Sequence, residues 1–163
     1  YSDYALSQGI IGNLPDDMNG TLTRQEFAAI IANALPNEAL PAVNSVPFGS
    51  IPDVYRSDAS IYKLYRAGIL AGNDSAGTFL PNAPITRAEV ATIFFRMLLE
   101  ESRQQYWSQT NPYYDVSPAD WYNNAISTMT SAGIVEGLRI KRKARLECQY
   151  YPRGVCGLGS TLL

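Results

Sequence analysis

Histidine is absent from the 163 residues of this chain, which removes the side chain that most often serves as a general base or metal ligand. The two cysteines, Cys148 and Cys156, both lie close to the C-terminal end. No stretch is long and apolar enough to span a bilayer. Glycoside hydrolysis needs a pair of acidic residues, but the repeat described below already accounts for the acidic positions of this chain. We therefore expect no enzyme, and we assign no catalytic residue, metal ligand or cofactor.

A short motif occurs twice, as Leu22-Thr23-Arg24-Gln25-Glu26 and Ile85-Thr86-Arg87-Ala88-Glu89, with the two threonines 63 residues apart. Thr-x-x-Glu is a capping box, in which threonine and glutamate satisfy backbone N–H groups at the start of a helix. We assign helix-capping roles to Thr23, Glu26, Thr86 and Glu89. The capping box does not explain the arginine between them, because the N-terminal end of a helix disfavours a cation. Anion binding would supply a reason, and pairing with a neighbouring acid is the alternative.

Further landmarks recur in the same order, which indicates a repeat protein. The segment 67–72 is echoed by 132–137 and more loosely by 9–12, and Ile51–Val54 is echoed by Tyr113–Val116. Each unit of about 60 residues would contain a turn bearing aspartate, a short helix, a Gly-Ile turn, a loop, the Thr-Arg-x-Glu motif and a longer helix. The units are 1–46 (start missing), 47–110 (complete) and 111–138 (first half), so we expect a fragment, followed by a tail over 139–163.

Apolar spacing predicts both helices of a unit. The longer helices carry stripes at Phe27, Ile30, Ile31, Ala34 and Leu35, and at Val90, Ile93, Phe94, Met97 and Leu98; the shorter ones at Ile61, Leu64 and Tyr65, and at Ala125, Ile126 and Met129. Ser117-Pro118 is predicted to start the third unit's helix, and Gly68 and Gly133 to end helices in the left-handed conformation. The segments 36–47 and 102–112 are predicted linkers. The fold class is mainly all-α, built from tandem helix–loop–helix repeats.

The tail differs in charge from the rest of the chain. Residues 1–138 hold 7 Lys and Arg against 14 Asp and Glu, whereas residues 139–163 hold 6 against 1. One permitted set of codons for residues 146–158, read one nucleotide later, gives L-N-A-N-I-T-R-A-E-F-A-A, close to N-A-P-I-T-R-A-E-V-A-T at residues 82–92. We hypothesise that residues from about 138 onward are out of frame; a natural basic tail is the alternative. If the tail is out of frame, neither cysteine indicates a redox compartment, and the basic residues of the tail do not support nucleic-acid binding.

A calcium module is a second interpretation of the first motif. The window 15–26 places Asp17, Asn19, Gly20 and Glu26 at positions of an EF-hand loop, but its first position is Pro15. The equivalent window ending at Glu89 has apolar residues where the loop needs aspartate and glycine. We therefore assign no metal site, and keep a calcium-binding or protein–protein interaction module as the alternative function.

The combined motifs resemble the S-layer homology family, whose repeat pattern is approximately F-x-D, a helix bearing Trp or Tyr, G-I-x-x-G, F-x-P and T-R-A-E. The second unit matches at Asp53, Gly68-Ile69, Gly72, Phe79-Leu80-Pro81 and Thr86–Glu89. The third matches at Tyr113–Asp115, Trp121-Tyr122 and 133–137, and then departs; the first matches at 9–12 and 23–26 and lacks F-x-P.

The resemblance implies three units in a pseudo-threefold helical bundle. Such modules attach larger surface proteins non-covalently to secondary cell wall polysaccharide, often pyruvylated, in grooves between units. It therefore implies a bacterial cell wall or S-layer location, with polysaccharide rather than nucleic acid or membrane as the partner. The ligand-binding residues it implies are Arg24, Arg87, Asp53, Asp115 and Trp121.

Overall fold

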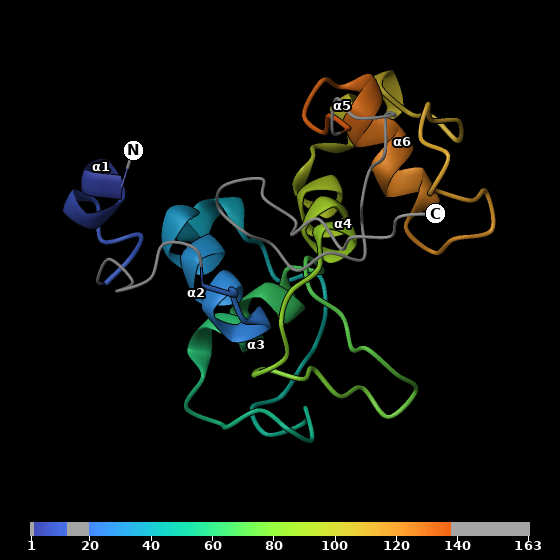
Figure 1. Ribbon diagram of the computed structural model, residues 1–163. Helices are drawn as coiled ribbons and strands as arrows, with labels where there is room; N and C mark the ends of the chain where they lie inside the picture. The colour runs from blue at the N-terminus through green and yellow to red at the C-terminus, as the bar shows by residue number, and fades with distance from the viewer. Residues whose placement is uncertain (1, 13–19, 138–163) are drawn as a thin grey trace, which may run out of the picture.

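The computed structural model describes residues 2–12 and 20–137, and over these residues the regular elements are helices (Figure 1). They are α1 (Ser2–Ser7), α2 (Arg24–Ala34), the 3₁₀ helix η1 (Asn37–Ala39), α3 (Ala59–Arg66), α4 (Arg87–Met97), α5 (Glu100–Gln105) and α6 (Asn123–Ser131). None of these helices has the length and hydropathy needed to cross a bilayer. The prediction of a mainly helical repeat is confirmed. The basic tail, its cysteines and residues 15–19 of the calcium window lie outside the described residues.

Both predicted capping boxes are present. At the start of α2, the Thr23 hydroxyl accepts the Glu26 N–H at 3.2 Å and the Glu26 carboxylate accepts the Thr23 N–H at 2.8 Å. Thr86 and Glu89 repeat this geometry at the start of α4, at 3.2 and 2.8 Å. Each box satisfies N–H groups that a helix start leaves without an intrahelical partner. The two longer helices therefore begin at equivalent positions of their units.

The shorter helices end on glycine, as predicted. Gly68 and Gly133 both adopt φ +71°, a conformation that costs a residue with a side chain about 1 kcal/mol or more. The next N–H then turns back to the helix: Ile69 donates to the Leu64 carbonyl at 3.0 Å, and Ile134 donates to the Met129 carbonyl at 2.9 Å. These are Schellman stops, and they direct the chain into the loop that precedes the next motif.

Two local predictions are wrong. The helix of the third unit begins at Asn123 rather than at Pro118, because Asp120 accepts the Ser117 N–H at 2.7 Å and closes a separate turn first. The predicted linker 102–112 is helical at its start, where α5 extends to Gln105. Trp107 follows α5 and packs on Phe95 of α4 with ring centroids 6.2 Å apart. The connector is thereby attached to the second unit.

Helix α2 packs against α3, and α4 packs against α6 (Figure 1). The larger hydrophobic core joins the first two units and includes Phe27, Ile61, Leu64, Phe79 and Ile93. A smaller core joins α4 to the third unit through Ala88, Ala91, Tyr113, Val116 and Ile126. Helix α4 therefore contributes to both cores and positions the third unit relative to the first two. The pseudo-threefold arrangement itself stays a prediction.

The backbone also connects the first two units directly. Arg24 and Gln25 donate their N–H groups to the carbonyls of Ala83 and Pro81 at 2.9 and 3.0 Å, and Ile85 donates to Leu22 at 2.9 Å. These bonds flank the isolated bridge between Thr23 and Pro84. The start of α2 is therefore fixed against the loop that leads into α4.

Candidate ligand-binding groove

Arg24 occupies the junction between the first two units. Its Nε donates to the Phe79 carbonyl at 2.7 Å, and its guanidinium pairs with Glu89 and lies 4.8 Å from the centroid of the Phe79 ring. The side chains of Arg24 and Glu89 are only 9% and 17% exposed. The arginine of one motif is thus neutralised by the glutamate of the next, which explains a cation at this helix start.

Glu89 divides its carboxylate between two tasks. One oxygen, Oε2, caps α4 through the N–H of Thr86, while Oε1 pairs with Arg24. Because both oxygens are engaged, Glu89 couples the start of its own helix to the preceding unit.

Asp53 is also committed to the fold. Its two carboxylate oxygens accept the N–H groups of Phe79 and Leu80 at 2.8 and 2.6 Å. Leu80 has φ +58°, a left-handed conformation that side chains rarely adopt. The charge-assisted bonds from Asp53 hold this turn, which presents the Phe79 carbonyl to Arg24.

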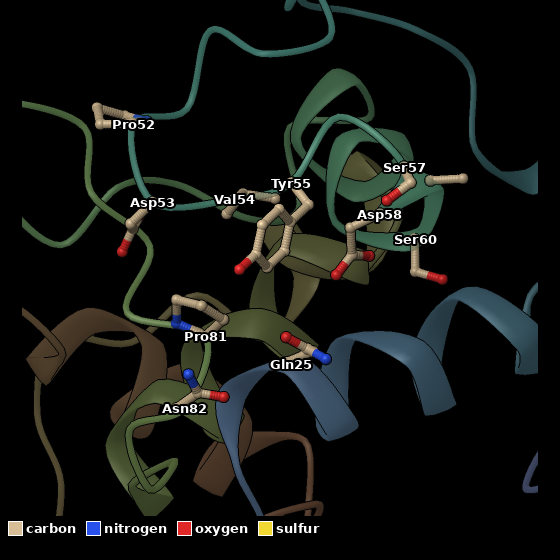
Figure 2. Close-up of a pocket in the computed structure, with 11 residues that line it drawn as sticks. Gln25, Pro52, Asp53, Val54, Tyr55, Ser57, Asp58, Ser60, Pro81 and Asn82 are labelled. Carbon is tan, nitrogen blue, oxygen red and sulfur yellow. The ribbon is translucent and has the colours of Figure 1, made fainter.

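A broad cleft of about 870 Å³ lies beside Asp53 (Figure 2). Figure 2 shows Asp53, Tyr55 and Asp58 on one side, and Gln25, Pro81 and Asn82 on the other. None of the 11 described residues that line this cleft is basic. Asp58 caps α3 by accepting the Ile61 N–H at 3.4 Å. The Asp53 cleft is therefore suited to hydroxyl groups and disfavours anions.

A second surface brings cations and aromatic rings together. Two cavities of about 260 and 740 Å³ share Thr92, Arg96 and Trp121 and form one continuous surface, called here the Arg96 groove. Its smaller part is also lined by the Arg24–Glu89 pair, and its larger part by Arg103 and Trp107. Trp121 is 66% exposed and Trp107 is 48% exposed. Segments of all three units therefore meet at this groove.

Arg96 and Arg103, two of the three arginines that line the Arg96 groove, are held by carbonyl oxygens. Arg96 donates to the Ile69 carbonyl at 3.2 Å, and Arg103 donates to the Leu98 carbonyl at 3.1 Å and stacks 5.2 Å from the Phe95 ring centroid. Partial burial lowers the pKa of Arg96 from its usual value, although a guanidinium stays charged at neutral pH. Glu100 lies 3.4 Å from Arg103 and offsets part of its charge. Arg96 has no ion pair among the described residues, so its charge is available to an anion.

The structure therefore distributes the five predicted site residues over several places. Arg24 and Trp121 line the Arg96 groove. Asp53 lines the cleft of Figure 2, and Arg87 lines a separate cavity against the third unit. Asp115 is half-buried in the turn before Val116 and lines neither surface. The groove thus contains two of the five.

Sequence reasoning missed Arg96, Arg103 and Trp107. A signal for Arg96 was present, because Glu89, Thr92 and Arg96 follow at i, i+3 and i+7 and define a polar stripe on α4. No comparable signal marks Trp107, which reaches the groove only because the predicted linker folds back on Phe95.

The first two units are joined through the Thr-Arg-x-Glu motif, and a groove lies where the units meet. This arrangement defines a tandem-repeat module. The family model for the S-layer homology domain matches residues 50–91 and 112–138. The predicted resemblance is thereby confirmed, and these residues are S-layer homology repeats. The second matched segment ends at 138, where the sequence departs from the repeat pattern.

Relatives agree with this family. Cell surface glycoprotein 1 of Acetivibrio thermocellus is 30% identical over 123 residues, which is 71% of this chain and 5% of that protein. Surface-layer 125 kDa protein of Lysinibacillus sphaericus is 35% identical over 119 residues, 71% of this chain and 9% of that protein. Endo-1,4-beta-xylanase A of Thermoanaerobacterium saccharolyticum is 32% identical over 126 residues, which is 77% of this chain and 10% of that protein.

The chain spans a tenth or less of the length of these three relatives. The similarity to the xylanase is confined to that small part of the enzyme, so it transfers no catalytic activity. The family match and the surface-layer relatives place the chain at the cell surface, in association with the cell wall.

Proposed function

We propose that this chain anchors a larger surface protein to the cell wall by binding an anionic, pyruvylated secondary cell wall polysaccharide in the Arg96 groove. The observation that carries the proposal is the composition of that groove. It combines the charge of Arg96, which has no ion pair within residues 2–12 and 20–137, with two exposed indole rings and residues from all three units. A polymer that crosses several units finds a continuous surface there.

The chemistry of the groove fits a sugar that bears a carboxylate. The Arg96 guanidinium offers charge-assisted hydrogen bonds, worth about 1.5–3 kcal/mol each, to a ketal carboxylate. Trp121 and Trp107 offer flat apolar faces to sugar rings. Thr92 and Asn124 line the same groove and supply polar groups for hydroxyls. Arg24 lines the inner end of the groove, where its bonds to Phe79 and Glu89 keep it in place and Glu89 neutralises its charge.

The Asp53 cleft is the less suitable surface for this ligand. It contains two carboxylates and no basic side chain among its lining residues, so a ketal carboxylate would be repelled. Asp53 acts on the groove indirectly, because it fixes the turn that presents the Phe79 carbonyl to Arg24.

The test is co-sedimentation of the purified chain with Gram-positive cell walls, before and after acid extraction of the secondary polysaccharide. Arg96→Gln and Trp121→Ala are expected to weaken binding to intact walls by about tenfold or more. Arg56→Gln and Tyr55→Ala are the matched controls, because both side chains are exposed and Tyr55 belongs to the Asp53 cleft. Circular dichroism establishes that each variant is folded.

The results separate the two surfaces. Loss of binding in the groove variants and on acid extraction, with unchanged controls, supports the proposal. Loss in Tyr55→Ala alone would move the polysaccharide to the Asp53 cleft. Binding that survives acid extraction would refute the secondary polysaccharide as the ligand.

A further inference from the structure

The joint between the first two units consists of four matched contacts. The Phe79 carbonyl receives Arg24 Nε, Glu89 pairs with the same guanidinium, and the carbonyls of Ala83 and Pro81 receive the backbone N–H groups of Arg24 and Gln25. All four come from an F-x-P turn followed by a Thr-Arg-x-Glu helix. The joint therefore shows what partner the start of such a motif accepts.

The same positions one unit later have no such partner within residues 2–12 and 20–137. The Nε atom of Arg87 is buried and no hydrogen-bond acceptor reaches it. The backbone N–H groups of Arg87 and Ala88, equivalent to those of Arg24 and Gln25, likewise have no acceptor in the described part of the chain. A buried donor without an acceptor is costly, and folded proteins rarely leave one.

An apolar cavity of about 170 Å³ adjoins this open motif. It is lined by Arg87, Val90, Ala91, Phe94, Ile126, Ile134, Val135 and Glu136, from α4 and the third unit. Ile134, at its edge, is 54% exposed. At the first joint Phe27, which occupies the position of Val90 in its motif, is buried against Phe94 with ring centroids 6.1 Å apart. The second joint thus has the donors and the apolar surface of the first, with space beside them.

We propose that this Arg87 surface is a docking site for an F-x-P turn and Thr-Arg-x-Glu helix supplied by a polypeptide other than this chain, because this chain's own Phe79 carbonyl and Glu89 are already bound to Arg24. The occupant's carbonyls receive the N–H groups of Arg87 and Ala88, as Ala83 and Pro81 do for Arg24 and Gln25. Its glutamate pairs with the Arg87 guanidinium, whose Nε is covered in the free chain. The cavity receives the first apolar residue of the docked helix. This site lies apart from the Arg96 groove and requires no polysaccharide.

The test uses the full chain and a fluorescent peptide with the sequence of residues 77–92, which contains the F-x-P turn and the Thr-Arg-x-Glu motif. Fluorescence anisotropy is expected to show saturable binding, weakened at least tenfold by Arg87→Gln in the chain or by Glu89→Gln in the peptide. Arg56→Gln, which removes an exposed charge of the same unit, is expected to have no effect.

A charge exchange makes the test specific. Arg87→Glu in the chain is expected to abolish binding of the original peptide and to restore binding of the peptide with Glu89→Arg. No binding by the folded chain, or binding that Arg87→Gln leaves unchanged, overturns the proposal. Analytical sedimentation of the chain alone tests for self-association. If the chain associates with itself and Arg87→Gln abolishes that association, the occupant is a second copy of this chain and the proposal is overturned.

Discussion

The two arginines of the repeated motif are expected to differ sharply in their contribution to stability. Arg24→Met keeps much of the aliphatic stem but removes the guanidinium, so that Glu89 and the Phe79 carbonyl lose their partner at a site where both charged side chains are largely buried. Arg87→Met makes the same chemical change where the buried Nε has no acceptor among the described residues. The two variants therefore compare one motif position with and without its partner.

The magnitudes follow from the burial of the pair. Removing one partner of a buried ion pair costs about 3–5 kcal/mol, because the other charge is left uncompensated. A whole domain is stable by only about 5–15 kcal/mol, so Arg24→Met removes a large part of that stability. Arg87→Met loses no such pair and relieves an unsatisfied donor, so its effect is expected to stay within about 1 kcal/mol.

Urea unfolding followed by circular dichroism measures the difference. With a slope of about 2 kcal/mol per M, a loss of about 4 kcal/mol lowers the midpoint by about 2 M, whereas Arg87→Met shifts it by about 0.5 M or less. The double variant Arg24→Met/Glu89→Gln is expected to recover part of the loss, because no buried charge is then left unpaired. Equal effects of Arg24→Met and Arg87→Met would refute this account of the joint.

Three further outcomes follow from the geometry. Asp53→Asn removes the negative charge that receives two N–H groups of the Phe79–Leu80 turn, and is expected to lower the free energy of unfolding by about 2 kcal/mol in urea titrations; an unchanged midpoint would contradict that role. Burial raises the pKa of Tyr65 from 10.0 to about 12, so its contribution to stability is complete below pH 10 and is lost as the pH rises towards 12; Tyr65→Phe should remove that part of the alkaline loss, and identical pH profiles would exclude it. A Cβ at Gly72 would lie 2.7 Å from the Gly77 Cα, so Gly72→Ala should lower the melting temperature more than Gly133→Ala. The Gly133 Cβ would meet nothing within 4 Å, and that substitution has only the cost of its positive φ, about 1 kcal/mol.

Local features of this fold were predictable from the sequence, and the contacts between units were not. The capping boxes and the Gly68 and Gly133 stops depend on residues within one helical turn, so short motifs specify them. The Ser117-Pro118 prediction was wrong because Asp120, three residues on, closes a turn that competes with the helix.

For the candidate site, too, local signals were predictable from the sequence and contacts between units were not. The motif marked Arg24 as unusual, but its partner Glu89 lies 65 residues away and follows only from the packing of two units. Trp121 was found through the family pattern, and the structure places it in the Arg96 groove. Arg96 and Trp107 were missed because their importance comes from the place where α4 and the 106–110 connector meet the third unit.

The sharing of one ion pair between Arg24 and Glu89 constrains how genes of this kind can change length. The pair takes its arginine from the first repeat and its glutamate from the second. Duplication or deletion of a whole repeat therefore leaves every internal arginine facing a glutamate, wherever the recombination point falls. A deletion that removes only the glutamate-bearing motif instead leaves the buried arginine without its partner, at a cost of about 3–5 kcal/mol. The electrostatics of the joint thus opposes the loss of a single motif, as the packing of the helices also does.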